Sequence, residues 1–115
     1  MIKVRLGDIF QGTKILISLT DKELAIKAGY KLNKIVESCL IELPKIEKCH
    51  TDLVLKYSGG TDKVLPENTE VFLTELNDFL QSEVEIMGEK LSVEEIEDCK
   101  IKPVELKIIE SFLSN

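Results

Sequence analysis

The sequence is poor in the residues that most often carry chemistry. It has no tryptophan, one histidine, His50, and three cysteines. A single histidine excludes a metal site built on two histidines, and it leaves His50 as one catalytic candidate without an obvious nucleophile partner. No residue pair stands out as a nucleophile and its base, so we expect the protein not to be an enzyme and to need no cofactor.

The cysteines are odd in number and lack the dense spacing of a secreted disulfide scaffold. We therefore expect reduced thiols, with Cys39 and Cys49 serving as small hydrophobic residues on a helix. The alternative is a zinc site made by Cys39, Cys49, His50 and Cys99. Structural zinc usually takes close pairs such as C-x-x-C, which this chain lacks, so we expect no metal.

Long apolar runs are also missing. No run approaches the roughly 20 residues that a membrane-spanning helix needs. The first apolar residues alternate with Lys3 and Arg5 instead of forming the apolar block of a signal peptide. We therefore expect no membrane association and a cytoplasmic location. The length of 115 residues, with 43% hydrophobic residues, predicts one globular domain over residues 1–115.

The main positive signal is a long amphipathic helix over residues 20–57. Apolar residues recur there at steps of three and four, which places them on one helix face. Thr20 and Glu23 have the spacing of a capping box at its start, and Ser58 with two glycines ends it. Pro44 removes a backbone donor, but the apolar stripe continues in phase across it, which favours a kinked continuous helix over two helices. The stripe comprises Leu24, Ala28, Leu32, Ile35, Cys39, Leu43, Ile46, Cys49, Leu53 and Tyr57.

The other predicted elements are shorter. Before the long helix we expect a strand over 2–6 and a helix over 9–19, capped by Asp8 and broken near Gly12. After it we expect a brief strand over 61–65, a helix over 66–82 that folds back on the long one, and a hairpin over 83–92. An acidic turn over 94–98, with a capping box between Ser92 and Glu95, and a helix opened by Pro103 complete the chain.

These elements predict an α+β protein that is mostly helical. One long helix, kinked at Pro44, should pack against shorter helices beside a small antiparallel sheet or hairpin. We expect its apolar stripe to form the core together with Phe72, Leu76, Phe79, Ile108 and Phe112.

Charge is divided unevenly along the chain. Residues 1–60 carry ten Lys or Arg against seven Asp or Glu, whereas residues 61–115 carry five against fourteen. Acidic surfaces steer encounters with basic protein partners. The predicted partner-binding residues are the acidic cluster Glu94, Glu95, Glu97 and Asp98.

The lysines of the long helix raise nucleic-acid binding as an alternative. They are Lys27, Lys31, Lys34, Lys45, Lys48 and Lys56. However, the net charge is −6, Arg5 is the one arginine, and no aromatic residues alternate with the lysines to stack on bases. We therefore expect these lysines to be solvated and to face the acidic half in part, and we expect a protein partner.

Several short motifs spread over the chain carry a resemblance to known sequences. They are Leu6-Gly7-Asp8, the run from Ile26 to Lys34, Leu55-Lys56-Tyr57, Pro66-Glu67-Asn68, Glu75-Leu76-Asn77, Glu83-Val84-Glu85, Leu91-Ser92, and the run from Pro103 to Leu106. With these motifs the chain resembles a family of small uncharacterised proteins encoded by tailed phages and prophages. The resemblance covers nearly the whole chain. It implies a phage-related, intracellular protein of a bacterial host, and it assigns no functional residue.

Two functions remain in view. The first is an interaction protein without catalysis that binds a host or phage protein, for example as an inhibitor of a host defence system. The second is a virion or assembly component, such as a chaperone or a minor head or tail protein, in which the long helix would serve self-association and the chain could form a homo-oligomer. A small enzyme comes third.

Overall fold

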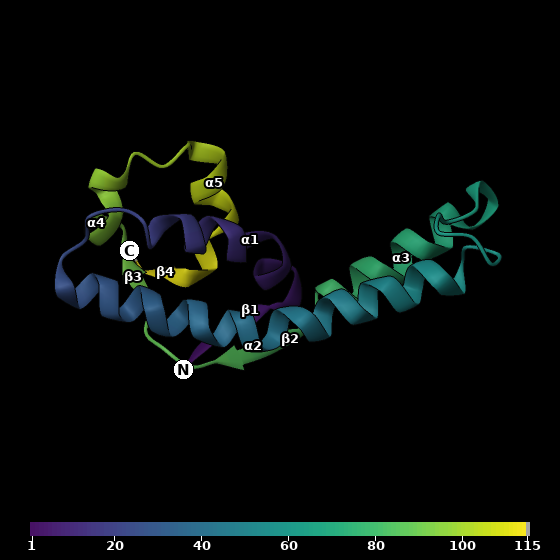
Figure 1. Ribbon diagram of the computed structural model, residues 1–115, viewed down its shortest axis with the longest axis horizontal. Helices are drawn as coiled ribbons and strands as arrows, with labels where there is room; N and C mark the ends of the chain where they lie inside the picture. The colour runs from purple at the N-terminus through teal and green to yellow at the C-terminus, as the bar shows by residue number, and fades with distance from the viewer. Residues whose placement is uncertain (115) are drawn as a thin grey trace.

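The computed structural model describes residues 1–114, which form an elongated molecule of 50 × 25 × 22 Å (Figure 1). In chain order the helices and strands are β1 (Ile2–Arg5), α1 (Leu6–Leu19), α2 (Ile26–Lys56), α3 (Thr69–Leu80), β2 (Glu83–Ile86), β3 (Leu91–Ser92), α4 (Val93–Ile96), α5 (Pro103–Ile108) and β4 (Leu113–Ser114), with 3-10 turns at Pro66–Asn68, Glu97–Cys99 and Glu110–Phe112. The predicted class, α+β and mostly helical with one long helix, is confirmed.

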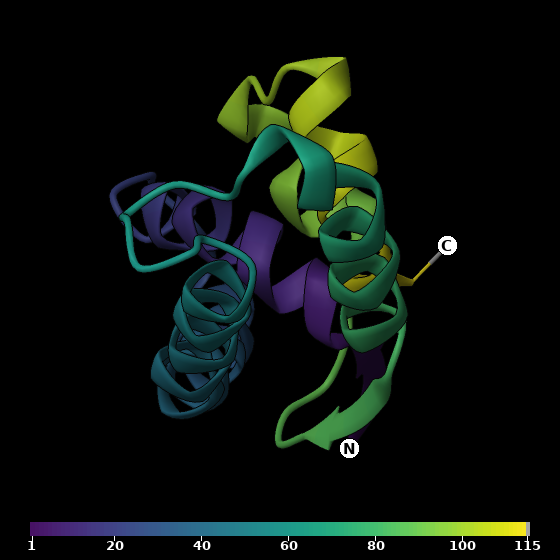
Figure 2. The ribbon, with the colours of Figure 1, turned by 90° about the vertical axis from the view of Figure 1, so that its right-hand side faces the viewer.

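The long helix α2 passes through two parts of the molecule (Figure 1). We call residues 1–48 and 81–114 the body, because both strand pairs, α1, α4 and α5 gather there around the N-terminal part of α2. Residues 49–80 form the arm, in which the last turns of α2 run beside α3 and extend away from the body (Figure 1 and Figure 2). The predicted folding back of this second helix is confirmed.

Helix α2 continues through Pro44, as the unbroken apolar stripe predicted, and its axis bends part-way along (Figure 1). The predicted start at Thr20 is wrong, because α2 begins at Ile26. Thr20 instead closes α1. Its backbone N–H donates to the carbonyl of Ile17 at 3.0 Å, and its hydroxyl donates to the same oxygen at 2.6 Å. A capping-box spacing with Glu23 was therefore a coincidence of sequence.

Helix α1 also differs from its prediction. It begins at Leu6 rather than Ile9, and the Asp8 carboxylate lies in its first turn, where it accepts from the backbone N–H of Arg5 at 2.9 Å. No break occurs at Gly12. A β-carbon at Gly12 would lie 3.3 Å from the ring of Phe112, so this glycine lets the C-terminal segment pack closely against α1.

The predicted hairpin over residues 83–92 is wrong. β2 pairs antiparallel with β1, placing Ile2 opposite Ile86, whereas β3 pairs parallel with β4. The segment between β2 and β3 crosses α2 instead of turning back. Gly88 has a φ of +126°, and a β-carbon there would lie 3.2 Å from the Ile35 side chain. Because the two strands diverge around α2, each finds its partner elsewhere in the chain.

Three smaller expectations can also be compared with the structure. No strand forms over residues 61–65, where Leu65 N–H donates to the carbonyl of Tyr57 at 3.0 Å. The capping box is present, since Ser92 and Glu95 exchange backbone-to-side-chain hydrogen bonds. The last helix, α5, begins at Pro103 as predicted and ends at Ile108, and Val104 near its start is 63% exposed.

The core lies in the body, between the inner face of α2, α1, the two strand pairs and the C-terminal turn. Ile109 and Phe112 are fully buried there, whereas the predicted core residue Ile108 is half-buried. In the arm, Phe72 is buried as predicted, but Leu76 and Phe79 are half-buried, and Cys49 is exposed rather than packed. Fully buried core side chains include Ile9, Leu16, Leu32, Ile35, Cys39, Leu91 and Ile109.

Candidate protein-interaction surfaces

The arm is held together by contacts between the end of α2 and α3. Lys56 Nζ lies 2.9 Å from Glu75 Oε1, and the carbonyl of Tyr57 accepts from the side-chain amide of Asn68 at 3.1 Å. Hydrogen bonding to Glu75 raises the pKa of Lys56, and the bond from Lys56 lowers the pKa of Glu75. Both side chains lie at the surface, where an ion pair adds little to the free energy of unfolding. Its main role is to connect α2 and α3.

A series of rings joins the arm to the body. The ring centroids of Phe10 and His50 lie 5.6 Å apart, those of His50 and Phe72 6.2 Å, and those of Phe72 and Tyr57 6.4 Å. His50 therefore sits between a ring of α1 and a ring of α3. Sequence reasoning considered His50 for metal binding or catalysis and missed this packing role, although its position one turn from Leu53 and Ile46 on the apolar stripe was a signal.

Large apolar side chains are exposed on the arm. Leu55 is 58% exposed, Val71 54% and Leu73 55%. Two packed helices cover each other only along their common interface. Apolar residues beside that interface stay exposed because no third element packs over them. Exposed apolar residues also occur on the body, for example Ile26 and Ile41. Within residues 1–114, Val71 on the arm combines such exposure with a hollow that it lines, as Met1 and Tyr30 do on the body.

Two shallow hollows that share Glu75 lie on the arm, and we call them together the arm groove. The first, of about 360 Å³, is lined by Cys49, Asp52, Leu53, Lys56, Glu75 and Phe79, and its wall is mainly apolar. The second, of about 370 Å³, is lined by Tyr57, Glu70, Val71, Thr74, Glu75 and Asp78. Glu75 lines both, so its ion pair with Lys56 forms the divide between them.

The predicted acidic cluster lies at the other end of the molecule, on α4 and the turn after it (Figure 1). Glu94, Glu97 and Asp98 are exposed as expected. Glu95 is not free for a partner: its Oε1 accepts from Ser92 N–H at 2.9 Å and lies 3.3 Å from Lys31 Nζ. The bond from the Ser92 backbone, and then Lys31, lower the pKa of Glu95. The prediction that all four residues are freely exposed is therefore wrong at Glu95.

The lysines of α2 partly face the acidic half, as predicted. Lys31 pairs with Glu95, and Lys56 pairs with Glu75. Lys45 Nζ lies 3.8 Å from Oε1 of Glu42 on the same helix, and Lys34 Nζ lies over the ring of Tyr30. Several lysines of the long helix are therefore already engaged in contacts within the chain.

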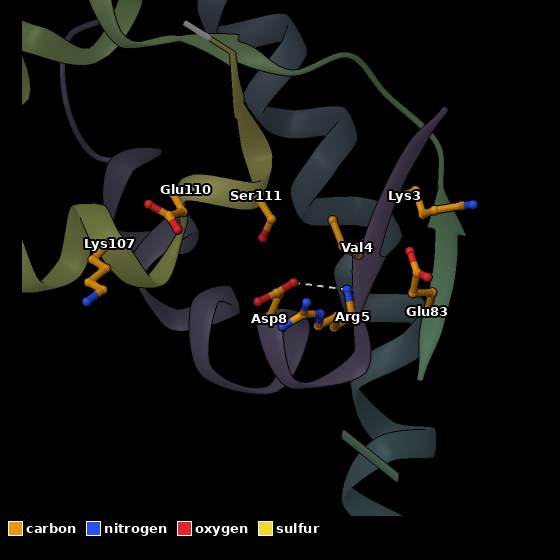
Figure 3. A pocket seen from close by; sticks show the side chains of 8 residues that line it. All are labelled: Lys3, Val4, Arg5, Asp8, Glu83, Lys107, Glu110 and Ser111. Atoms are coloured by element: carbon orange, nitrogen blue, oxygen red, sulfur yellow. Dashed lines mark hydrogen bonds between the residues drawn. The ribbon is translucent and has the colours of Figure 1, made fainter. Parts of the chain in front are cut away.

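A further hollow, of about 500 Å³, opens beside β1, between the start of α1 and the C-terminal turn (Figure 3). Three cationic and three anionic side chains line it: Lys3, Arg5, Lys107, Asp8, Glu83 and Glu110. The Ser111 hydroxyl also lines it and has no hydrogen-bond partner within residues 1–114. Because the opposite charges balance, a ligand of one sign would gain little attraction here.

The cysteines do not gather. Cys39 and Cys99 are buried and Cys49 is exposed, and none forms a disulfide within the described chain. Burial raises the pKa of the Cys39 thiol to about 11, so this thiol stays protonated at neutral pH. Across residues 1–114, no three His, Cys, Asp or Glu side chains lie close enough together to hold a metal ion.

Comparison with known proteins gave no match to a protein-family model, a curated protein or a solved structure. None of the helices in residues 1–114 is both long enough and apolar enough to span a membrane.

Proposed function

We propose that this chain is a protein-binding module without catalysis, of phage or prophage origin, that acts on a host or phage protein in the bacterial cytoplasm. The observation that carries the proposal is the arm, which extends from the body and exposes apolar side chains such as Val71 beside acidic ones such as Asp78. Exposed apolar residues rimmed by polar ones are typical of protein-interaction sites. The phage origin rests on the sequence resemblance alone.

The sign of the charge favours a basic partner. The arm groove is lined by four acidic residues and one lysine, and the net charge of the chain is −6. Such a surface attracts basic proteins and is repelled by phosphate backbones. A basic surface that normally contacts nucleic acid would suit it, which is how the chain would inhibit a host defence protein.

The proposal that the chain is not an enzyme rests on what its histidine does. The His50 ring packs between Phe10 and Phe72 and so serves to connect α1, α2 and α3. A second candidate function is a virion or assembly component. The elongated arm with its exposed Leu55, Val71 and Leu73 favours this alternative, because self-association would cover such residues.

Affinity purification from infected or producing cells, followed by mass spectrometry and by binding of the purified partner, tests the proposal. We expect one specific protein partner and binding that weakens as salt rises. Micromolar or tighter binding to DNA or RNA at physiological salt, lost when Lys27 and Lys34 are changed to glutamate, would contradict it. Stoichiometric amounts of the chain in purified virions would favour the assembly function instead.

A further inference from the structure

The length of the arm groove matches about two turns of a helical ligand. On one side the lining runs along α2 from Cys49 to Tyr57, the residue after the helix end, and on the other along α3 from Glu70 to Phe79. At 1.5 Å per residue, these sides are about 12 and 14 Å long. Apolar residues at i, i+4 and i+7 of an amphipathic helix span about 10 Å, so they reach from one hollow to the other.

The rim of the groove carries an excess of negative charge. The lining residues Asp52, Glu70 and Asp78 have no oppositely charged partner within 4 Å among the described residues, whereas Glu75 is paired with Lys56. A second copy of this chain would bring the same acidic rim against its own, which like-charge repulsion disfavours. A helix with lysine or arginine flanking its apolar stripe would be attracted.

We propose that the arm groove binds one basic amphipathic helix of the partner protein. Apolar side chains of that helix enter the two hollows, and its cationic side chains lie over Asp52, Glu70 and Asp78. This inference rests on the proposed function, since it names the site and the partner chemistry of a protein-binding module. It moves the binding site from the predicted cluster at Glu94 to the arm.

The test uses a fluorescently labelled synthetic peptide, helical, with leucines at i, i+4 and i+7 and lysine or arginine on either side. Its control has the same composition with the leucines scattered around the helix. Fluorescence anisotropy with the full chain should show tighter binding of the first peptide, and this binding should weaken as salt rises.

Matched variants locate the site. Val71 and Leu73 are on the same helix and are 54% and 55% exposed, but Leu73 lines neither hollow. Val71→Lys should weaken peptide binding about tenfold or more, and Leu73→Lys should leave it within about twofold. Likewise, Glu70→Lys with Asp78→Lys should weaken binding far more than Glu94→Lys with Glu97→Lys, which changes the net charge equally. Circular dichroism should show the same helix content and thermal midpoint in all four variants.

Four results would overturn the inference. The first is no binding of the peptide at millimolar concentration, and the second is equal binding of the scattered control. The third is concentration-dependent self-association of the unmodified chain that Val71→Lys abolishes, which would make a second copy the occupant. A natural partner that binds the Val71→Lys variant as tightly as the unmodified chain would also reject the groove, while leaving the proposed protein-binding function intact.

Discussion

The body and the arm share one helix but are built differently. In the body, α2 packs against α1, the strands and the C-terminal turn, and side chains such as Ile35 and Phe112 are fully buried. In the arm the same helix packs mainly on α3 and the loop that leads to it, with His50 also against Phe10 of α1. Phe72 is the one apolar side chain of the arm with less than a tenth of its surface exposed. Buried apolar side chains are therefore concentrated in the body, and apolar surface of the arm stays open to a partner.

The largest effect should come from cavities in the body. We expect Leu32→Ala or Ile35→Ala to lower the free energy of unfolding by about 2 to 5 kcal/mol, because each removes a fully buried aliphatic side chain. Leu55→Ala, on the arm end of the same helix and 58% exposed, should change it by less than about 0.5 kcal/mol. Urea unfolding measures all three. Equal losses at the three positions would remove the distinction between body and arm.

A smaller and more local loss is expected in the arm. Phe72→Ala should cost about 2 kcal/mol, below the 3 to 5 kcal/mol typical of a core phenylalanine, because the two arm helices can close over the gap. Hydrogen exchange should show faster exchange of α3 amides, while amides around Leu32 in the body keep their protection. Uniform loss of protection throughout the chain would instead show that arm and body unfold together.

The ring contacts between the two parts predict an intermediate effect. His50→Ala removes the ring between Phe10 and Phe72 and should cost about 1.5 kcal/mol. His50→Phe keeps a ring of similar shape and should recover most of this loss. Thermal unfolding of both variants measures the loss of stability. If His50→Phe cost as much as His50→Ala, the ring nitrogens of His50 would matter more than its packing.

The smallest effect concerns a pH-dependent contact in the body. The pKa of Glu95 is lower in the folded chain than in the unfolded one. The stabilisation that its charged carboxylate gives the fold is therefore fully present above the pKa of the unfolded chain, and it is lost as pH falls through the pKa of the folded chain. Glu95→Ala should therefore cost about 1 kcal/mol at pH 7, and less below about pH 4. Glu94→Ala, at an exposed neighbour, is the control. A loss that does not change with pH would exclude the charge of Glu95 as its cause.

Local sequence patterns predicted the helices well, because the residues that start, continue and end a helix lie close together in the sequence. The apolar stripe of α2 continued through Pro44, and the spacing of Ser92 and Glu95 formed a real cap. The same spacing failed at Thr20, since a hydroxyl can serve the end of one helix as readily as the start of the next.

Strand partners could not be read from local sequence. Alternation showed that residues 83–86 form a strand, but its pairing with β1 depends on how the chain passes Ile35 at Gly88. The candidate site had the same difficulty. The sequence showed that the second half is acidic, but neither the engagement of Glu95 by Lys31 nor the grouping of Glu70, Val71 and Asp78 in a groove has a local signature.

The strand pairing also bears on the order in which the chain assembles. β1 pairs with a strand about 80 residues further along the chain, and the core stays incomplete until Phe112 packs against Gly12. The arm brings together two helices joined by residues 57–68, so it closes a much smaller loop than the strand pairing does, at a lower entropic cost. The region with the least buried surface in the finished molecule is therefore one of the first that can form while the chain is still searching for its fold.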